Sequence, residues 1–198
     1  GMLVILAGTF AVSAKYFWQN YKAIYTAIVG GCVALITSAI LLSASLRARV
    51  LSMFAMRQDS SNSFRFNVYQ SSFNMFKENW LLGIGVGNKN FREIYGLYMR
   101  TGFDALSAYN IFLEIAVESG IFALIAFLGF AITLLVDGAK IILKSTDVRK
   151  VIFLSGAAIS IFAVMVHGLV DTVFFRPQIQ FIFWTMCAII SAESKRQS

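Results

Sequence analysis

Two carboxylic acids, Glu114 and Glu118, lie in a segment that is otherwise almost entirely apolar. Residues 104–119 predict a helix, and its polar residues recur at spacings of three, four and four, which places them on one helix face: Ser107, Asn110, Glu114 and Glu118. Acids at membrane depth are costly and usually face a cavity or a partner. We therefore predict that this polar stripe carries chemistry or a buried network. The alternative is that both acids lie shallow, at the water interface.

A single arginine, Arg65, flanks a stripe of aromatic residues. The stripe repeats every three or four positions, which predicts an amphipathic helix at the membrane surface or against the bundle: Phe66, Tyr69, Phe73, Phe76 and Trp80. Turn and helix-capping residues precede it at 59–63. A guanidinium at the lipid boundary offers a planar fork for phosphate or carboxylate. Arg65 is thus a candidate anion-binding residue, and interfacial snorkelling is the alternative.

Three glycines follow this helix, and they predict a loop with tight backbone turns: Gly83, Gly85 and Gly87. They do not form a dinucleotide-binding loop, because that loop needs a strand before it and a helix after it within a βαβ unit. The loop can still present backbone amides to an anion. We therefore assign the three glycines to a diphosphate or anion site, together with Arg57 of the same polar segment.

The only histidine, His167, lies four residues before Asp171, with Arg176 just beyond. A His–Asp pair can act as a base and its orienting group. Such a trio more often closes a helix end, so we assign these three residues to a structural network. Cys32 and Cys187 lie in apolar runs and are predicted to be small helix residues. No metal-ligand cluster and no G-x-S-x-G motif occur, so neither a metal nor another cofactor is predicted.

The elements that must position these residues are membrane helices. Of 198 residues, 58% are hydrophobic and 14% are charged, against about 45–50% and about 25% in soluble domains. Apolar runs predict a truncated first span, three full spans and a shorter fifth, in this order: 1–14, 23–46, 120–136, 151–169 and 179–192. The predicted fold class is all-α, a polytopic transmembrane helical bundle with a large extracytoplasmic loop containing an amphipathic helix.

Three regions follow from this pattern. Residues 1–46 carry transmembrane helices, 47–107 form the extracytoplasmic loop with its surface helix, and 108–198 carry a re-entrant or interfacial helix and three transmembrane helices. Lysines and arginines of the short loops and of the C-terminus share one side under alternation, and that side is predicted to be cytoplasmic. The long loop is then periplasmic, in a bacterial inner membrane. The charge of +7 is spread over several loops, so membrane lipids rather than nucleic acid are the predicted partner.

Three motifs follow one another along the polar segment and the helix after it. They are R-x-x-x-Y at 65–69, W-L-L-G-I-G-x-G-N-x-x-F at 80–91 and A-Y-N-x-x-L-E-x-x-x-E-x-G at 108–120. Together they resemble the O-antigen ligase/polymerase (Wzy C-terminal domain) superfamily. Within it, residues 59–68, 95–98 and 167–178 resemble the IctB branch, whose members are named inorganic-carbon transporters. Members are longer and have more spans before this point, so we expect a C-terminal fragment.

The resemblance implies a chemistry and roles for residues. In the ligases a polyprenyl-diphosphate-linked glycan is transferred at the periplasmic side without a metal. An outer-loop arginine holds the diphosphate, and Arg65 matches it. A histidine before an asparagine is the base for the acceptor hydroxyl; here Tyr109 takes that position before Asn110. The candidate catalytic set is therefore Tyr109, Asn110, Glu114 and Glu118, although a tyrosine hydroxyl is a poor base at neutral pH.

Three functions stay open at this point. The first is a metal-independent glycosyltransferase that handles a polyprenyl-diphosphate-linked glycan, and it is the one that we favour. The second is a transporter, or a transport-associated protein, for bicarbonate or another small anion, although no broken paired helices or repeat halves are visible. The third is a non-catalytic scaffold of the envelope.

Overall fold

The computed structural model describes residues 5, 7–9, 22–45, 47–48 and 60–196. Over these residues the chain is helical and has no strand, so the all-α prediction is confirmed. Three of the described helices are long and apolar enough to cross a membrane. The chain divides into two compact units, residues 10–66 and residues 1–9 with 67–198.

In the first unit, α2 (Lys22–Leu42) is an apolar helix of 21 residues. It covers most of the predicted span 23–46 and is one of the three helices able to cross a membrane. Its described side chains are largely exposed, including Leu35 and Leu42. So much exposed apolar surface is unfavourable in water, and lipid removes that cost. Most of the predicted span 1–14 lies outside the described residues.

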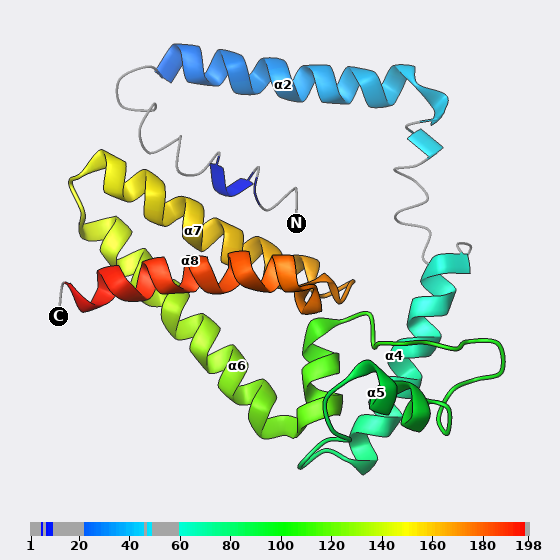
Figure 1. Cartoon of the computed structure of the whole chain (residues 1–198). Helices are drawn as coiled ribbons and strands as arrows, with labels where there is room; N and C mark the ends of the chain where they lie inside the picture. The colour runs from blue at the N-terminus through cyan, green and yellow to red at the C-terminus, as the bar shows by residue number, and fades with distance from the viewer. Residues whose placement is uncertain (1–4, 6, 10–21, 46, 49–59, 197–198) are drawn as a thin grey trace. The chain divides into compact units, whose positions relative to one another are not determined.

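In the second unit, α6 (Ile111–Lys144), α7 (Val148–His167) and α8 (Pro177–Lys195) pack together as a helical bundle (Figure 1). Their facing sides form the apolar core, which includes Leu134, Leu154, Ile161, Phe183, Cys187 and Ile190. Cys187 is buried there as a free thiol, as predicted. α6 and α7 are long and apolar enough to cross a membrane. α8 is less hydrophobic than either, and its crossing stays a prediction.

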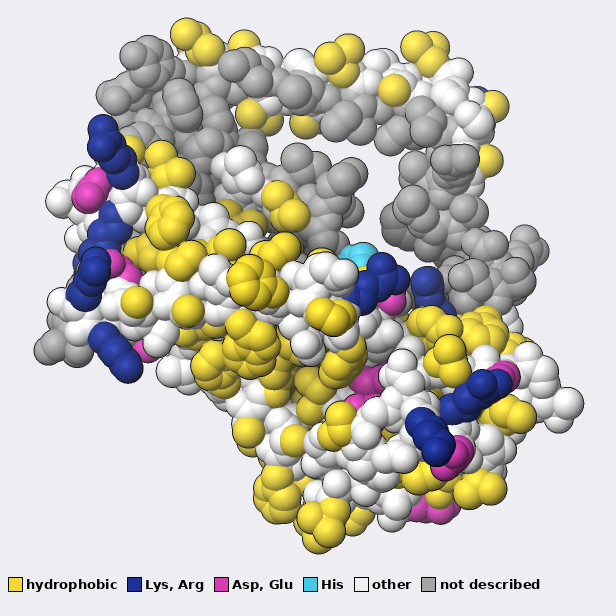
Figure 2. Space-filling model, viewed as in Figure 1, with side chains coloured by type: hydrophobic (Ala, Val, Ile, Leu, Met, Phe, Trp, Pro, Cys, Tyr) yellow, Lys and Arg dark blue, Asp and Glu magenta, His cyan; other side chains and the backbone are white. Residues whose placement is uncertain are grey.

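The surface of this bundle is apolar along its middle and basic at one end (Figure 2). Aromatic side chains of α7 and α8 are exposed, as at Phe153 and Phe181. The basic end collects the end of α6, the start of α7 and the end of α8, with Lys140, Lys144, Arg149, Lys150, Lys195 and Arg196. An ion pair between Lys150 and Glu193 joins α7 to α8 there. The bundle thus has the surface of a membrane-embedded body with a charged end.

α6 is two helices joined by a sharp bend, which is visible in Figure 1. At the bend, Gly120 has φ 80° and ψ 178°, a conformation open essentially only to glycine. The helix predicted for 104–119 was placed too early, since α6 begins at Ile111. Tyr109, with φ 51°, breaks the helical path before that point, and Asn110 caps the helix. Ser107 therefore does not share a helix face with Glu114.

α4 (Ser60–Glu78) and α5 (Asn88–Tyr95) precede the bend. α4 begins in the predicted capping run 59–63. The aromatic stripe of α4 stays outward, with Phe73 48% exposed, while the neighbouring face is buried at Val68, Ser71, Ser72 and Met75. Hydrogen bonds hold this arrangement, because Arg100 donates to Asn67 Oδ1 and to Gln70 Oε1, each at 2.9 Å.

Candidate functional site

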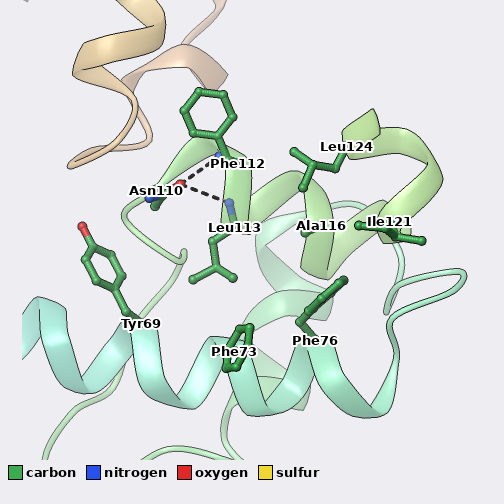
Figure 3. A pocket seen from close by; sticks show the side chains of 9 residues that line it. All are labelled: Tyr69, Phe73, Phe76, Asn110, Phe112, Leu113, Ala116, Ile121 and Leu124. Atoms are coloured by element: carbon green, nitrogen blue, oxygen red, sulfur yellow. Dashed lines mark hydrogen bonds between the residues drawn. The ribbon is translucent and has the colours of Figure 1, made fainter. Parts of the chain in front are cut away.

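The turn at residues 107–110 holds the two residues that the family resemblance assigns to the reaction centre. Tyr109 has φ 51°, which is uncommon for a residue other than glycine. The Asn110 side-chain oxygen accepts from the amides of Phe112 at 2.9 Å and Leu113 at 3.1 Å, and so caps α6 (Figure 3). Its amide nitrogen donates to the Leu169 carbonyl at 3.0 Å. Asn110 thus joins the start of α6 to the end of α7.

Tyr69 supports the same turn from α4. Its hydroxyl lies 3.1 Å from the Tyr109 carbonyl and 3.4 Å from the Leu169 carbonyl. The Ile111 amide also donates to the Gly168 carbonyl, at 2.8 Å. The sequence did not single out these α7-end carbonyls, because a backbone acceptor has no side-chain signature. The R-x-x-x-Y motif therefore contains a tyrosine that holds the turn.

Glu114 and Glu118 lie in the part of α6 before the bend, and both are buried, with 2% and 5% exposure. The Glu114 carboxylate accepts from the backbone amide of Ala108, in the turn. The Glu118 carboxylate accepts from the Gly87 amide at 3.0 Å. Each acid thus holds one loop against α6, and a buried amide without such an acceptor would be unfavourable.

The glycine loop packs directly on the backbone of α6. The Ile84 amide donates to Val117 O at 2.9 Å, and the Gly85 amide donates to Glu118 O at 3.0 Å. A β-carbon on Gly83, which has φ 73°, would lie 2.4 Å from the Glu118 backbone. The loop thus needs glycine for close approach. The amides of Gly83, Gly85 and Gly87 all donate to protein oxygens.

An apolar groove of about 480 Å³ runs between α4 and α6 (Figure 3). One wall is the aromatic stripe of α4, and the other includes Leu113 and Ala116. Its lining continues past the bend of α6 to Leu124, within the long apolar part of the helix. Asn110 is the one amide side chain on its wall. The groove therefore has the chemistry to receive a hydrocarbon chain, and its lining reaches the turn at Asn110.

The remaining candidates are more dispersed. Arg65 is half-buried on α4, four positions before Tyr69, and Arg57 lies outside the described residues. His167 Nε2 is 3.9 Å from Asp171 Oδ2. The other carboxylate oxygen of Asp171, Oδ1, accepts from the Thr172 amide at 2.7 Å. Arg176 precedes α8, and over residues 60–196 it makes no ion pair with a carboxylate. No group of three potential metal ligands occurs among the described side chains.

Two tyrosines hold the segment between α5 and the turn. The Tyr98 hydroxyl donates to the Glu78 carboxylate, and this hydrogen bond raises the pKa of Tyr98 above its ordinary value. The Tyr95 hydroxyl donates to the Phe103 carbonyl at 2.9 Å, and desolvation by burial raises the pKa of Tyr95. Both hydroxyls therefore stay protonated donors at neutral pH and hold the segment on α4 and α5.

The sequence of the chain matches the model of a known protein family. The model of the O-antigen ligase family (Wzy_C) matches residues 1–128, which is more than half of the chain. The chain belongs to the O-antigen ligase family. Membership indicates a membrane protein of the glycan ligase or polymerase class. No curated protein and no solved structure matches the chain.

The O-antigen ligase match contains most of the candidate site. It includes α4, the glycine loop and the turn, and it ends within α6 after the bend. The groove residues Tyr69, Asn110 and Leu124 all fall inside it. His167, Asp171 and Arg176 fall outside the matched range.

Proposed function

We propose that this member of the O-antigen ligase family transfers a glycan from a polyprenyl diphosphate to an acceptor hydroxyl at the periplasmic face of the bacterial inner membrane. The observation that carries the proposal is the apolar groove, which runs from the long part of α6 to the turn with Tyr109 and Asn110. A lipid-linked donor needs such a path, because its tail must stay out of water while its head group reaches the reacting residues.

In this proposal the polyprenyl tail lies along the aromatic stripe of α4, against Phe73 and Phe76. Arg65 is four residues before Tyr69 on the same helix and pairs with the diphosphate through its planar fork. Arg57, in the same polar segment, adds a second positive charge to the leaving group. The three glycines contribute by shaping the loop, since their amides already donate to protein oxygens.

The transfer step needs one proton acceptor and one leaving group. The acceptor oxygen forms a bond to the sugar carbon while the bond from that carbon to the diphosphate oxygen breaks. The proton of the acceptor hydroxyl passes to water at position 109, where the family's base lies, and the electron pair of the broken bond leaves with the diphosphate, which Arg65 stabilises. Asn110, Glu114 and Glu118 act as positioning residues, because they hold the turn and the glycine loop on α6.

Arg65→Ala in the full-length protein tests this proposal. We expect glycan transfer to fall by on the order of 10²–10³-fold, since a charge that stabilises the leaving group is lost. Arg65→Lys should recover only part of the activity, because lysine lacks the two-pronged fork. Lys89→Ala, which removes an exposed charge from α5, is the matched control. Transfer is followed by gel mobility of the acceptor with a purified polyprenyl-diphosphate oligosaccharide. Unchanged transfer by the Arg65→Ala protein would remove the main support for the proposal.

Tyr109→His tests the position of the base. Histidine adopts positive φ more readily than most residues, so it suits the 51° of this position. We expect the rate of transfer at neutral pH to rise by up to about 10²-fold, because an imidazole accepts a proton there. That gain should disappear as the pH falls below about 6.5, the ordinary imidazole pKa. If the Tyr109→His protein has the parent rate at every pH, the proton acceptor of the reaction lies elsewhere.

The transport and scaffold readings predict other results. A bicarbonate transporter of the IctB type would move labelled bicarbonate into liposomes, and Arg65→Ala would leave surface glycans intact. A scaffold would move no bicarbonate and would transfer no glycan in the gel assay. No feature of the described residues favours a conducting path over the groove, so glycan transfer is the function that we propose.

A further inference from the structure

A small polar cavity of about 190 Å³ shares the 107–110 turn with the apolar groove. The turn contributes Asn110 to the groove and Ser107 to the cavity. Segments far apart in the sequence meet in the cavity wall, which includes Asn88, Ser107, Glu114, Thr172, Phe175 and Arg176. The proposed transfer chemistry assigns this cavity no ligand. Its volume suits one small ring.

The cavity wall offers both donors and acceptors of hydrogen bonds. The hydroxyls of Ser107 and Thr172 are 3.0 Å apart, and either one can donate. The Glu114 carboxylate is 2% exposed and uses Oε2 to accept from Ala108. Within residues 60–196 its other oxygen has no donor, which leaves Oε1 available to a ligand hydroxyl. The Asn88 amide adds one more donor and one more acceptor.

The cavity wall combines a buried carboxyl group with a guanidinium. An ammonium would meet the Arg176 guanidinium and be repelled. A neutral ligand with several hydroxyls avoids that penalty. It can form a hydrogen bond with the Glu114 carboxyl group while it accepts from the guanidinium.

Phe175 gives the cavity an aromatic surface. Its ring is 38% exposed and stands edge to face against Phe174, at 5.5 Å between ring centres and 81° between planes. Phe174 is itself buried in the bundle core and packs edge to face on Phe183. The Phe175 ring is thus held in place, and a flat apolar ring face can pack against it. A sugar ring presents an apolar face of C–H groups and an edge of hydroxyls. The aromatic ring fits the first, and the carboxyl, amide and hydroxyl groups of the wall fit the second.

We infer that this cavity binds one neutral pyranose ring. The inference rests on the proposed function in one respect, which is that the ring belongs to the acceptor. The shared turn then places the acceptor beside the donor groove. Binding of the ring itself needs no transfer. The cavity would select an acceptor by its sugar, while the groove selects the donor by its lipid.

Saturation-transfer NMR on the full-length protein tests the inference. The protein is kept in a detergent without a sugar head group, such as lauryldimethylamine oxide, because a maltoside would compete. The probes are methyl glucopyranoside, methyl galactopyranoside and methyl N-acetylglucosaminide, with cyclohexanol, glucose 6-phosphate and glucosamine as comparison compounds. We expect saturation of at least one neutral pyranoside, and less of the apolar and charged compounds.

Two wall substitutions locate the binding. Phe175→Leu and Thr172→Val should each lower the affinity for the pyranoside by about 3- to 10-fold. The first removes the aromatic ring face, and the second removes a hydroxyl. Phe181→Leu and Thr185→Val make the same chemical changes on the exposed side of α8 and should leave binding unchanged. Circular dichroism confirms that each variant is folded before binding is compared.

The results separate this inference from the proposed function. Pyranoside binding that depends on Phe175 supports the cavity even where Arg65→Ala leaves transfer unchanged and the proposed function fails. Arg65-dependent transfer, with no pyranoside bound by the folded protein, overturns the cavity and leaves the proposed function standing. Stronger saturation of glucose 6-phosphate than of the neutral rings also overturns it, as does equal binding by the parent, Phe175→Leu and Thr172→Val proteins.

Discussion

Gly120→Ala is expected to lower the free energy of unfolding by about 3 kcal/mol or more, because the bend of α6 has no room for a side chain. Gly120 has φ 80° and ψ 178°, which residues with a β-carbon almost never adopt. An added β-carbon would also lie 2.2 Å from the Leu81 carbonyl oxygen. This oxygen is a backbone atom, so the chain itself would have to move. Thermal unfolding of the purified full-length protein in detergent, followed by tryptophan fluorescence, measures the change.

The bend also determines whether the site forms. The amide just after it, of Ile121, donates to the Trp80 carbonyl at 2.8 Å, and the helix before it binds the glycine loop. Gly129→Ala is the matched control, because Gly129 lies in the same helix with nothing within 4 Å of the added carbon. It should be neutral, or stabilising by up to about 1 kcal/mol. Equal thermal stability of the two variants would show that the bend is not needed for folding.

Glu114→Ala is expected to lower the free energy of unfolding by roughly 2–4 kcal/mol. The carboxylate accepts from the Ala108 amide, and Ala108 is fully buried. Alanine would leave that amide without its acceptor and would open a void beside it. Glu114→Gln keeps an acceptor oxygen of nearly the same shape, so we expect it to retain most of the stability. The same unfolding assay compares the two variants.

Glu93→Ala is the control for the loss of an acid. Glu93 is exposed on α5, and its replacement should change the free energy of unfolding by no more than about 0.5 kcal/mol. The order of stability expected is parent, then Glu114→Gln, then Glu114→Ala. If Glu114→Gln and Glu114→Ala are equally unstable, the oxygen that accepts from the Ala108 amide is not what stabilises the turn.

Local sequence patterns were sufficient to predict much of the helical fold. Runs of apolar residues identify α2, α6 and α7, because each apolar stretch must be long enough to cross the hydrocarbon core. The capping residues at 59–63 place the start of α4, and three close glycines indicate an irregular loop. The start of α6 was missed by seven residues, since helical periodicity through 104–110 does not show that Tyr109 adopts positive φ.

The candidate site was predicted less completely. Periodicity drew attention to Glu114 and Glu118, yet it could not show that their partners are the amides of Ala108 and Gly87. The second of these pairs spans 31 residues, and Ser107 and Thr172 are 65 apart in sequence. Contacts at such separations depend on how helices pack, and a single sequence carries no direct record of that packing.

By itself the sequence determined that this chain is a membrane-embedded helical protein, and it identified the segments that resemble an O-antigen ligase. These properties depend on composition, local periodicity and short motifs. Only the tertiary structure decided that the aromatic stripe of α4 lines a groove, that glycines are needed where two backbones touch, and that Phe175 faces a cavity with Glu114. The physical reason is that burial and hydrogen bonding depend on which surfaces meet after the bend at Gly120 folds α6 back on its loops.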